Sequence, residues 1–366
     1  MRITFVINGL GYAGAEKVVV FVAQNLQKRG HDVSIINLNS HKGQEDRKPD
    51  GIKVLTADIV YKGTLRTNWD WLAFTIKGAR LLKSELLVGF EFNCNFAVIL
   101  AAKKLHIPSI MCERGDPTRR LSAKGLNKLK FKTLNYASGA VFQTQGAAEA
   151  FSPSLQKRAK VIPNPIFVEG EIPEIDYSLR PKTVVSLGRI ENQQKRLDVM
   201  VKSFAIFHNR HPEYVLNIYG SAENAADMEA LNSWIKDADL EDSVVLKGVT
   251  QNSMTDLSKE GMYIITSDFE GISNALLEAM AVGLPVISTD HSPGGARMLI
   301  KDHENGLLVP MRNPEALAAA LCEYAENPAL AEQCGRAAKY VLDAFSPENI
   351  IDMWEKYFID IAKINA

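Results

Sequence analysis

The chain has 366 residues, of which 46% are hydrophobic and 23% are charged, and its formal net charge is −1. A chain of this length exceeds one ordinary core, so two domains are expected. The composition is that of a soluble globular protein, and no apolar run approaches the roughly 20 residues of a membrane-spanning helix. The first residues lack the apolar core and cleavage site of a secretory signal, which predicts a cytoplasmic protein.

The cysteines show no C-x-x-C spacing and occur at Cys94, Cys112, Cys322 and Cys334. We expect reduced, semi-buried thiols rather than disulfides or a zinc site. The D-x-D sequence at 237–239 falls at a polar helix end and is interpreted as a solvated face. The sequence therefore predicts no metal site.

The small net charge hides an asymmetry between the two halves. Residues 1–165 carry 25 Lys and Arg against 12 Asp and Glu, a balance of +13. Residues 166–366 carry 17 against 31, a balance of −14. Such asymmetry indicates that the first half meets an anionic partner, for which nucleic acid, anionic membrane lipid and a phosphorylated substrate are the candidates.

The chain begins with an apolar run at 3–7 and the loop NGLGYAGAE at 8–16, whose glycines, including Gly14, match G-x-G-x-x-G. This spacing lets a strand turn tightly into a helix and hold a pyrophosphate on backbone amides. A dinucleotide site also needs an acid after the second strand, and the run 33–38 is followed by none until Glu45. A tight turn therefore explains the glycines more simply than NAD does.

Apolar runs alternate with helical patterns along both halves. Strands are expected at 3–7, 33–38, 86–90, 107–112 and 139–143, and then at 183–187, 215–219, 243–246, 262–266 and 285–288. This alternation predicts an α/β protein with two Rossmann-like domains, whose parallel sheets face each other across a cleft. Broken periodicity from 163 to 182 predicts the linker, and 347–364 is expected to form one amphipathic helix.

Basic and apolar residues interleave in two stretches of the first half. The stretch 114–132 holds seven Lys and Arg and one acid, and a second basic group follows Trp69 with helical spacing. This mixture suits a membrane interface and a lipid-bound diphosphate, although an ordinary solvated helix explains either stretch alone. Phe131 is the only aromatic residue of 114–132, which disfavours nucleic acid. The residues expected to meet acceptor or membrane are Lys77, Arg80, Arg114, Arg119, Arg120, Lys124 and Lys128.

Cations follow the first strand of the second half. Gly188 ends that strand, and Arg189, Lys195 and Arg196 come after it. A diphosphate carries about two negative charges, so a flanking Arg and Lys would bind it and stabilise it as a leaving group. Lys195 and Arg196 compete for this role, and a solvated basic loop is the alternative.

The densest polar pattern runs from 268 to 280, after a buried strand and into a helix. Ser273 is a good N-cap, so the amides near it form an anion site at the helix start. Glu278 leans toward that start, where its carboxylate can bind both hydroxyls of a ribose, and Glu270 faces the same ligand. An ordinary cap with a solvated Glu is the alternative. The loop that carries Arg189 and the loop that carries Glu270 each follow a strand at the same edge of one sheet. Open α/β folds bind their ligands at this edge.

These residues carry a resemblance to a known family. The segment Glu270–Glu278 resembles the E-x7-E signature of the retaining glycosyltransferases of family four. Gly188-Arg189 with Lys195 resembles that family's G-R-x(n)-K element. Further elements that are similar and stand in family order are 13–16 (A-G-A-E), 163–165 (P-N-P) and 305–309 (N-G-L-L-V). The segment 294–297 looks closest to members that build bacterial surface polysaccharides and lipid-linked oligosaccharides.

The resemblance implies the GT-B fold, with an acceptor-binding domain at 1–165 and a nucleotide-sugar-binding domain at 166–346. It implies that 347–366 forms a helix that packs back on the first domain. The implied activity is retaining, metal-independent transfer of a hexose or N-acetylhexosamine, with a UDP-sugar as the expected donor and no cofactor. A polyprenyl-diphosphate-linked saccharide at the inner face of the cytoplasmic membrane is the expected acceptor, for example in O-antigen synthesis. A sugar-nucleotide epimerase or a binding protein without turnover is the alternative.

Residue roles also follow from the resemblance. The residues expected to act in catalysis are Glu270, Arg189, Lys195 and Glu113. Those expected to bind the donor are Gly14, Gly188, Arg196, Gly271, Ile272, Ser273, Asn274 and Glu278. Many family members carry a His where this chain reads Cys112-Glu113-Arg114, which leaves the contribution of Glu113 and Arg114 open. The spacing from Arg189 to Lys195 is one residue longer than the commonest family version.

Overall fold

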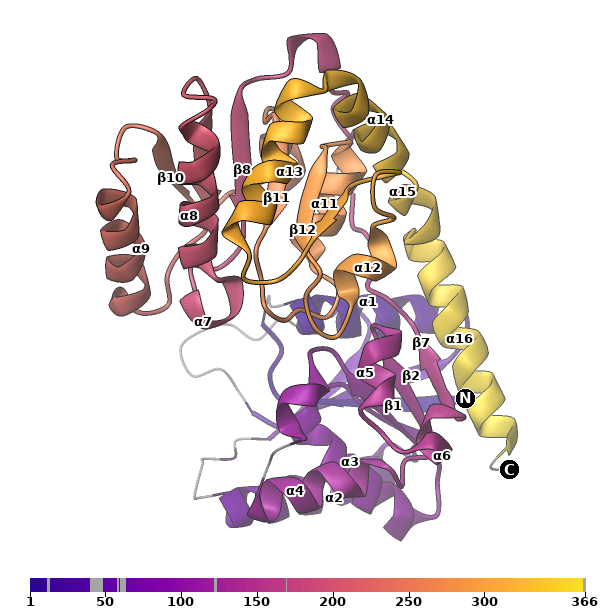
Figure 1. The fold of residues 1–366 in the computed structure, drawn as a ribbon. Coiled ribbons are helices and arrows are strands. Elements are labelled where there is room, and N and C mark those ends of the chain that lie inside the picture. The colour runs from indigo at the N-terminus through magenta and orange to yellow at the C-terminus, as the bar shows by residue number, and fades with distance from the viewer. Residues whose placement is uncertain are drawn as a thin grey trace. The chain divides into compact units, whose positions relative to one another are not determined.

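The fold is taken from a computed structural model of the chain. It describes residues 1–11, 14–39, 49–57, 59, 64–121, 124–168 and 170–364. The chain folds into two compact units, shown in Figure 1. The first unit comprises Met1–Pro165 and Pro347–Ala366, and the second comprises Ile166–Ser346. Within the described part of the chain, no helix combines the length and the apolar character that crossing a membrane requires.

The first unit is built on a seven-stranded parallel sheet with the order β3-β2-β1-β4-β5-β6-β7. Its strands are β1 (Arg2–Ile7), β2 (Asp32–Asn37), β3 (Lys53–Thr56), β4 (Leu86–Gly89), β5 (Ser109–Glu113), β6 (Gly139–Phe142) and β7 (Ala159–Val161). The inner strands β4, β5 and β6 are buried along their whole length because helices cover both sheet faces. Sequence patterns located the inner strands and missed β3 and β7, which are short and lie at the sheet edges.

Helices cover both faces of this sheet. One core joins the sheet to α1 (Gly14–Lys28) and α16 (Pro347–Ile364). A second core joins its other face to α2 (Thr64–Leu81) and α3 (Phe92–Leu105), and α4 (Gly125–Leu134) packs on α3. Shorter helices are η1 (Pro117–Arg120), α5 (Gln145–Glu149) and α6 (Pro153–Gln156).

Ion pairs fasten α16 to the first unit. The Arg29 guanidinium lies 2.6 Å from Asp352 and 2.7 Å from Glu355, and it also contacts Glu348. Nε2 of His31 lies 2.9 Å from the Glu355 carboxylate. The apolar face of α16 is buried in the same core as α1, and this burial stabilises the contact between the two helices. The ion pairs help to orient α16 on the unit.

The second unit contains a six-stranded parallel sheet with the order β10-β9-β8-β11-β12-β13. Its strands are β8 (Thr183–Leu187), β9 (Val215–Tyr219), β10 (Val244–Gly248), β11 (Met262–Ile265), β12 (Val286–Thr289) and β13 (Leu307–Val309). Its helices are η2 (Tyr177–Leu179), α7 (Asn192–Lys195), α8 (Leu197–His208), α9 (Ala225–Asp237), α10 (Ser253–Leu257), α11 (Asn274–Val282), α12 (Gly295–Leu299), α13 (Pro314–Glu326), α14 (Pro328–Ala338) and α15 (Val341–Ala344). The strand order reverses between β8 and β11, which makes the carboxyl ends of these strands the expected ligand position.

Candidate active site

The connection from β8 to α8 brings a lysine across the end of the sheet. The chain turns at Gly188 and Arg189, and Glu191 caps the one-turn helix α7 by accepting from the amides of Gln193 and Gln194. A Cβ on Gly188 would lie 3.3 Å from Cε of Lys195, so the absence of a side chain leaves room for the lysine stem.

Lys195 forms an ion pair with Glu270. Its Nζ lies 2.5 Å from Oε1 of Glu270, and both side chains are largely buried, with exposed fractions of 16% and 13%. The Ser267 hydroxyl donates to the same oxygen at 3.2 Å, and Thr266 donates to the Lys195 carbonyl oxygen at 2.6 Å. Within the described part of the chain, Glu270 accepts side-chain hydrogen bonds from Lys195 and Ser267. Both of these bonds use Oε1.

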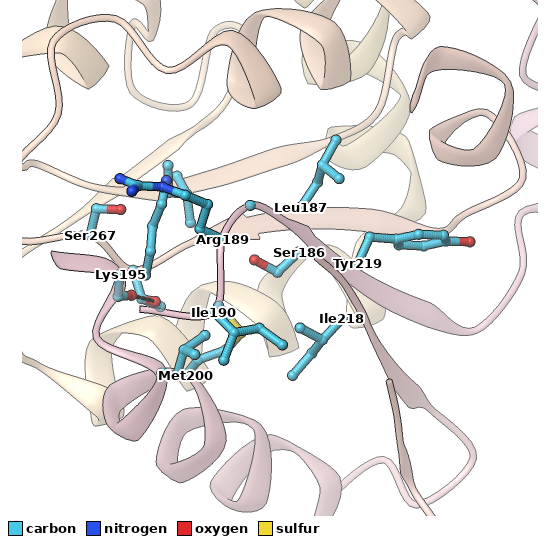
Figure 2. A pocket seen from close by; sticks show the side chains of 13 residues that line it. Ser186, Leu187, Arg189, Ile190, Lys195, Met200, Ile218, Tyr219 and Ser267 are labelled. Carbon is cyan, nitrogen blue, oxygen red and sulfur yellow. Dashed lines mark hydrogen bonds between the residues drawn. The ribbon is translucent and has the colours of Figure 1, made fainter. Parts of the chain in front are cut away.

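Lys195, Thr266 and Ser267 border a pocket at the carboxyl ends of β8 and β11. Figure 2 shows Lys195 and Ser267 at one side of it and Tyr219 at the other. The residues that line it are Ser186, Leu187, Gly188, Arg189, Ile190, Lys195, Leu197, Met200, Ile218, Tyr219, Ile265, Thr266 and Ser267. Arg189 is about half exposed, and its guanidinium lies 3.2 Å from Glu223. The pocket thus presents two cations above an apolar floor.

Arg196 does not line this pocket. From the sequence, either Arg196 or Lys195 could have been the cation that binds the diphosphate. Its guanidinium lies 2.6 Å from Asp198 and 3.3 Å from Asp268, and hydrogen bonding to Asp198 raises its pKa. Asp268 also holds Arg312 at 2.7 Å. Arg196 is therefore part of a structural ion-pair group, and Lys195 is the cation that lines the pocket.

Glu270 precedes α11, and Glu278 lies within this helix. Ser273 caps this helix by accepting from the amide of Leu276 at 3.4 Å, and Gly271 and Ile272 precede the cap. The Tyr263 hydroxyl, on the neighbouring strand β11, is buried, and burial followed by the charges of Glu270 and Glu278 raises its pKa. The charges of both carboxylates of the E-x7-E segment therefore add to the effect of burial on the pKa of this hydroxyl.

The first unit holds a group of carboxylates that the sequence analysis identified only in part. Glu113 ends β5 with a buried side chain, and its Oε1 accepts from the amide of Gly115 at 3.2 Å. Burial, together with the charges of Glu16 and Glu113, raises the pKa of Glu91 to about 7. Gly14 begins α1, whereas residues 12 and 13 of the glycine loop lie outside the described residues. The sequence feature that could have identified Glu91 is its position shortly after a buried strand.

The basic residues of the first unit divide into exposed and buried ones. An exposed set, here called the basic surface, comprises Lys77, Arg80, Arg119, Lys124, Lys128 and Lys132, with Trp69, Leu81, Leu121 and Leu129 exposed on the same segments. Its helices α2 and α4 both contact α3, and Figure 1 shows them on the same side of the sheet. Lys130 is buried, and the side chain of Arg120 lies outside the described residues.

Arg114 does not belong to the basic surface, so its expected place at the membrane is corrected. Its guanidinium donates to the Asn164 side chain and, at 3.5 Å, to the Ile162 carbonyl oxygen. It also lies over the Phe90 ring, 5.4 Å from the centroid, and burial lowers its pKa to about 10. Arg114 instead ties the end of β5 to the segment that leaves the unit.

Comparison with known proteins defines the family. The model for "Glycosyltransferase Family 4" matches residues 12–169, and the model for "Glycosyl transferases group 1" matches residues 171–341. The two matches together take in most of the chain and meet where the structure divides it. This chain belongs to the family-four glycosyltransferases and is a glycosyltransferase of the GT-B type.

Individual relatives agree with this assignment over the full length. An uncharacterized glycosyltransferase of Haemophilus influenzae is 27% identical over 97% of this chain and 99% of its own. The GalNAc-alpha-(1->4)-GalNAc-alpha-(1->3)-diNAcBac-PP-undecaprenol alpha-1,4-N-acetyl-D-galactosaminyltransferase of Campylobacter jejuni is 24% identical over 99% of both chains. Anabaena HepE, solved with UDP and glucose, superposes with a TM-score of 0.79 at 17% identity, over 98% of this chain and 99% of its own. Four other relatives match over 21% to 54% of their own length.

Proposed function

We propose that this chain is a retaining glycosyltransferase that moves a hexose or N-acetylhexosamine from a UDP-sugar to a saccharide carried on a polyprenyl diphosphate. The observation that carries the proposal is the Lys195–Glu270 pair, which stands beside Arg189 at the carboxyl ends of β8 and β11. The UDP and glucose bound by HepE support the donor class. The undecaprenol-linked saccharide in the name of the Campylobacter jejuni relative supports the acceptor class.

Arg189 and Lys195 bind the diphosphate in this proposal. Transfer breaks the bond between the anomeric carbon and the diphosphate, so negative charge grows on the leaving oxygen. Two cations at that position stabilise this charge more in the transition state than in the substrate, and Lys195 is already held there by Glu270. They take the role that a metal ion would otherwise have, and we propose that transfer needs no metal.

Glu270 binds the sugar hydroxyls through Oε2. Its Oε1 already accepts from Lys195 and Ser267, which fixes the carboxylate plane and directs the second oxygen to the ligand. Glu278 binds the ribose hydroxyls, and the capped start of α11 adds backbone amides for the phosphate. The bond formed joins the acceptor hydroxyl oxygen to the anomeric carbon, and the diphosphate leaves with the hydroxyl proton.

The basic surface brings the enzyme to its acceptor. Anionic lipid attracts each nearby Lys or Arg by about 1 kcal/mol, so the exposed cations of α2, η1 and α4 suffice for peripheral binding. The exposed Trp69, Leu121 and Leu129 add apolar contacts at the lipid interface. We therefore propose that the protein works on the inner face of the cytoplasmic membrane.

The test is a screen of UDP- and GDP-sugars against a polyprenyl-diphosphate-linked saccharide, read by mass spectrometry with and without EDTA. We expect one UDP-sugar to add a single sugar to the acceptor, equally in both conditions. Glu270→Gln should remove most of this product, and Glu229→Gln, an exposed change on α9, should not. A donor that is epimerised or hydrolysed, with no acceptor product, would contradict transfer.

A further inference from the structure

A buried histidine lies beneath the turn that carries Glu270. His291 follows β12, its side chain is wholly buried, and neither ring nitrogen has a hydrogen-bond partner within the described part of the chain. Buried polar groups are nearly always hydrogen-bonded, so an unpaired imidazole in the core calls for a physical explanation.

The backbone around His291 is locked to the Glu270 turn. The amide of Glu270 donates to the Ser292 carbonyl oxygen at 2.8 Å, and the amide of Ser292 donates to the Asp268 carbonyl oxygen at 3.1 Å. A Cβ on Gly295 would lie 1.7 Å from the Gly271 carbonyl oxygen and 3.1 Å from Cε1 of His291. The ring is therefore packed where two glycine-containing turns touch.

Charged groups act on the ring from three segments. Burial lowers the pKa of His291. The negative charge of Glu270, the backbone of Ser292 and the negative charge of Asp290 oppose this effect, and the positive charge of Lys195 adds to it. Asp290 is held by Arg297 at 2.6 Å, so its charge is already compensated. The ring is consequently neutral at pH 7, and a proton on it would attract Glu270 in competition with Lys195.

We propose that His291 is a positioning residue for Glu270: its uncharged ring supports the Glu270–Gly271 turn and leaves the Glu270 carboxylate on Lys195. The inference rests on the proposed sugar-binding role of Glu270. Protonation of the ring draws Glu270 from Lys195 and misdirects Oε2, so sugar transfer stops in mild acid while nucleotide binding persists.

The test compares wild type with His291→Phe between about pH 5 and pH 8. Phe keeps a ring in the cavity, cannot be charged and removes two unpaired nitrogens at small cost. Wild-type kcat should fall about tenfold for each pH unit below the pKa of the ring. His291→Phe should keep most activity at neutral pH and lack this acid limb, and its UDP dissociation constant should be unchanged. An identical acid limb in both proteins would contradict the inference, even where Glu270→Gln abolishes transfer.

A second measurement does not depend on activity. In wild type with 13C-labelled histidine, the His291 resonance should titrate below 6.5, and that of His303, whose pKa Asp302 and Glu323 raise against partial burial, should titrate above it. His291→Phe or His291→Gln assigns the resonance. Glu270→Gln should lower the titration midpoint of His291, because it removes the nearby negative charge. An unshifted midpoint would overturn the proposal, whereas absent turnover with a shifted midpoint would count against the proposed function alone.

Discussion

Nζ of Lys195 lies 2.5 Å from Oε1 of Glu270, although 75 positions separate the two residues in the chain. The first residue ends the one-turn helix after β8, and the second precedes α11. Their pairing brings one residue of the G-R-x(n)-K segment into contact with one residue of the E-x7-E segment.

Lys195→Met should reduce transfer by on the order of 10²- to 10³-fold, because it removes a cation at the position where charge develops on the diphosphate. Lys202→Met is the matched control, since this lysine is exposed on α8. Single-turnover kinetics at saturating donor measures the effect. Equal rates for the two variants would contradict a role for Lys195 in the transition state.

Glu278→Ala should weaken nucleotide binding by about 1–3 kcal/mol, because truncation leaves the ribose hydroxyls unpaired. Glu270→Gln should instead lower kcat and change the affinity for free UDP little, since we propose that Glu270 contacts the sugar and not the nucleotide. Calorimetry with UDP measures the first effect, and Glu229→Ala on α9 serves as the control. UDP affinity unchanged in Glu278→Ala would remove the ribose assignment.

Gly295→Ala should reduce both stability and transfer, because its Cβ would lie 1.7 Å from the Gly271 carbonyl oxygen. Separating two packed turns costs about 1–3 kcal/mol and displaces Glu270. Gly30→Ala is the control: its φ of +88° makes alanine unfavourable there, and no atom lies near the added Cβ. We expect comparable thermal shifts and a loss of transfer confined to Gly295→Ala.

Replacing Arg119, Lys124, Lys128 and Lys132 with Gln should weaken binding to anionic vesicles. The attraction is electrostatic and is screened within roughly 8 Å at physiological salt, so wild-type binding should also fall as salt rises. A matched variant changes four exposed lysines of the second unit, Lys202, Lys236, Lys247 and Lys259, to Gln. If both variants sediment with vesicles as wild type does at low salt, the basic surface is only a solvated face.

Glu91 should make the first unit less stable as pH rises. Its pKa of about 7 exceeds the ordinary 4.5, so the folded state holds a proton that the unfolded state releases between these values. Stability is therefore lost as pH rises from about 4.5 to about 7 and is constant above. Glu91→Gln should gain about 1–3 kcal/mol over wild type at pH 8 and little at pH 4.

Urea unfolding followed by tryptophan fluorescence measures the Glu91 effect, since Trp69, Trp71 and Trp354 all lie in the first unit. Glu149→Gln, an exposed change on α5, provides the control. A pH-independent gain in Glu91→Gln would show that folding does not raise the pKa of Glu91 and would contradict this prediction.

The sequence predicted the parts of this structure that local pattern determines. Continuous apolar runs located the buried strands except β13, and the amphipathic stretch 347–364 is the helix α16. The edge strands β3 and β7 were not predicted, because strands of three or four residues with exposed side chains have no distinctive sequence pattern. The family assignment rested on motifs in the right order, and family models then matched both units.

Contacts between loops that are distant in the chain could not be predicted from the sequence. The sequence could not show whether Lys195 or Arg196 binds the diphosphate, because two adjacent cations are equivalent in a sequence pattern. In the structure Arg196 pairs with Asp198 and Asp268, whereas Lys195 lines the pocket, so the two cations have different surroundings. His291 was overlooked for the same reason, since only the packed turns show that its ring is buried against the Glu270 segment.

The central claim is that the Lys195–Glu270 site binds the sugar nucleotide, and a crystal structure with a bound UDP-sugar tests it most directly. We predict the diphosphate on Arg189 and Lys195, a sugar hydroxyl on Oε2 of Glu270 and the ribose on Glu278. A diphosphate bound to the glycine loop of the first unit, with Glu270 touching no ligand atom, would contradict the account.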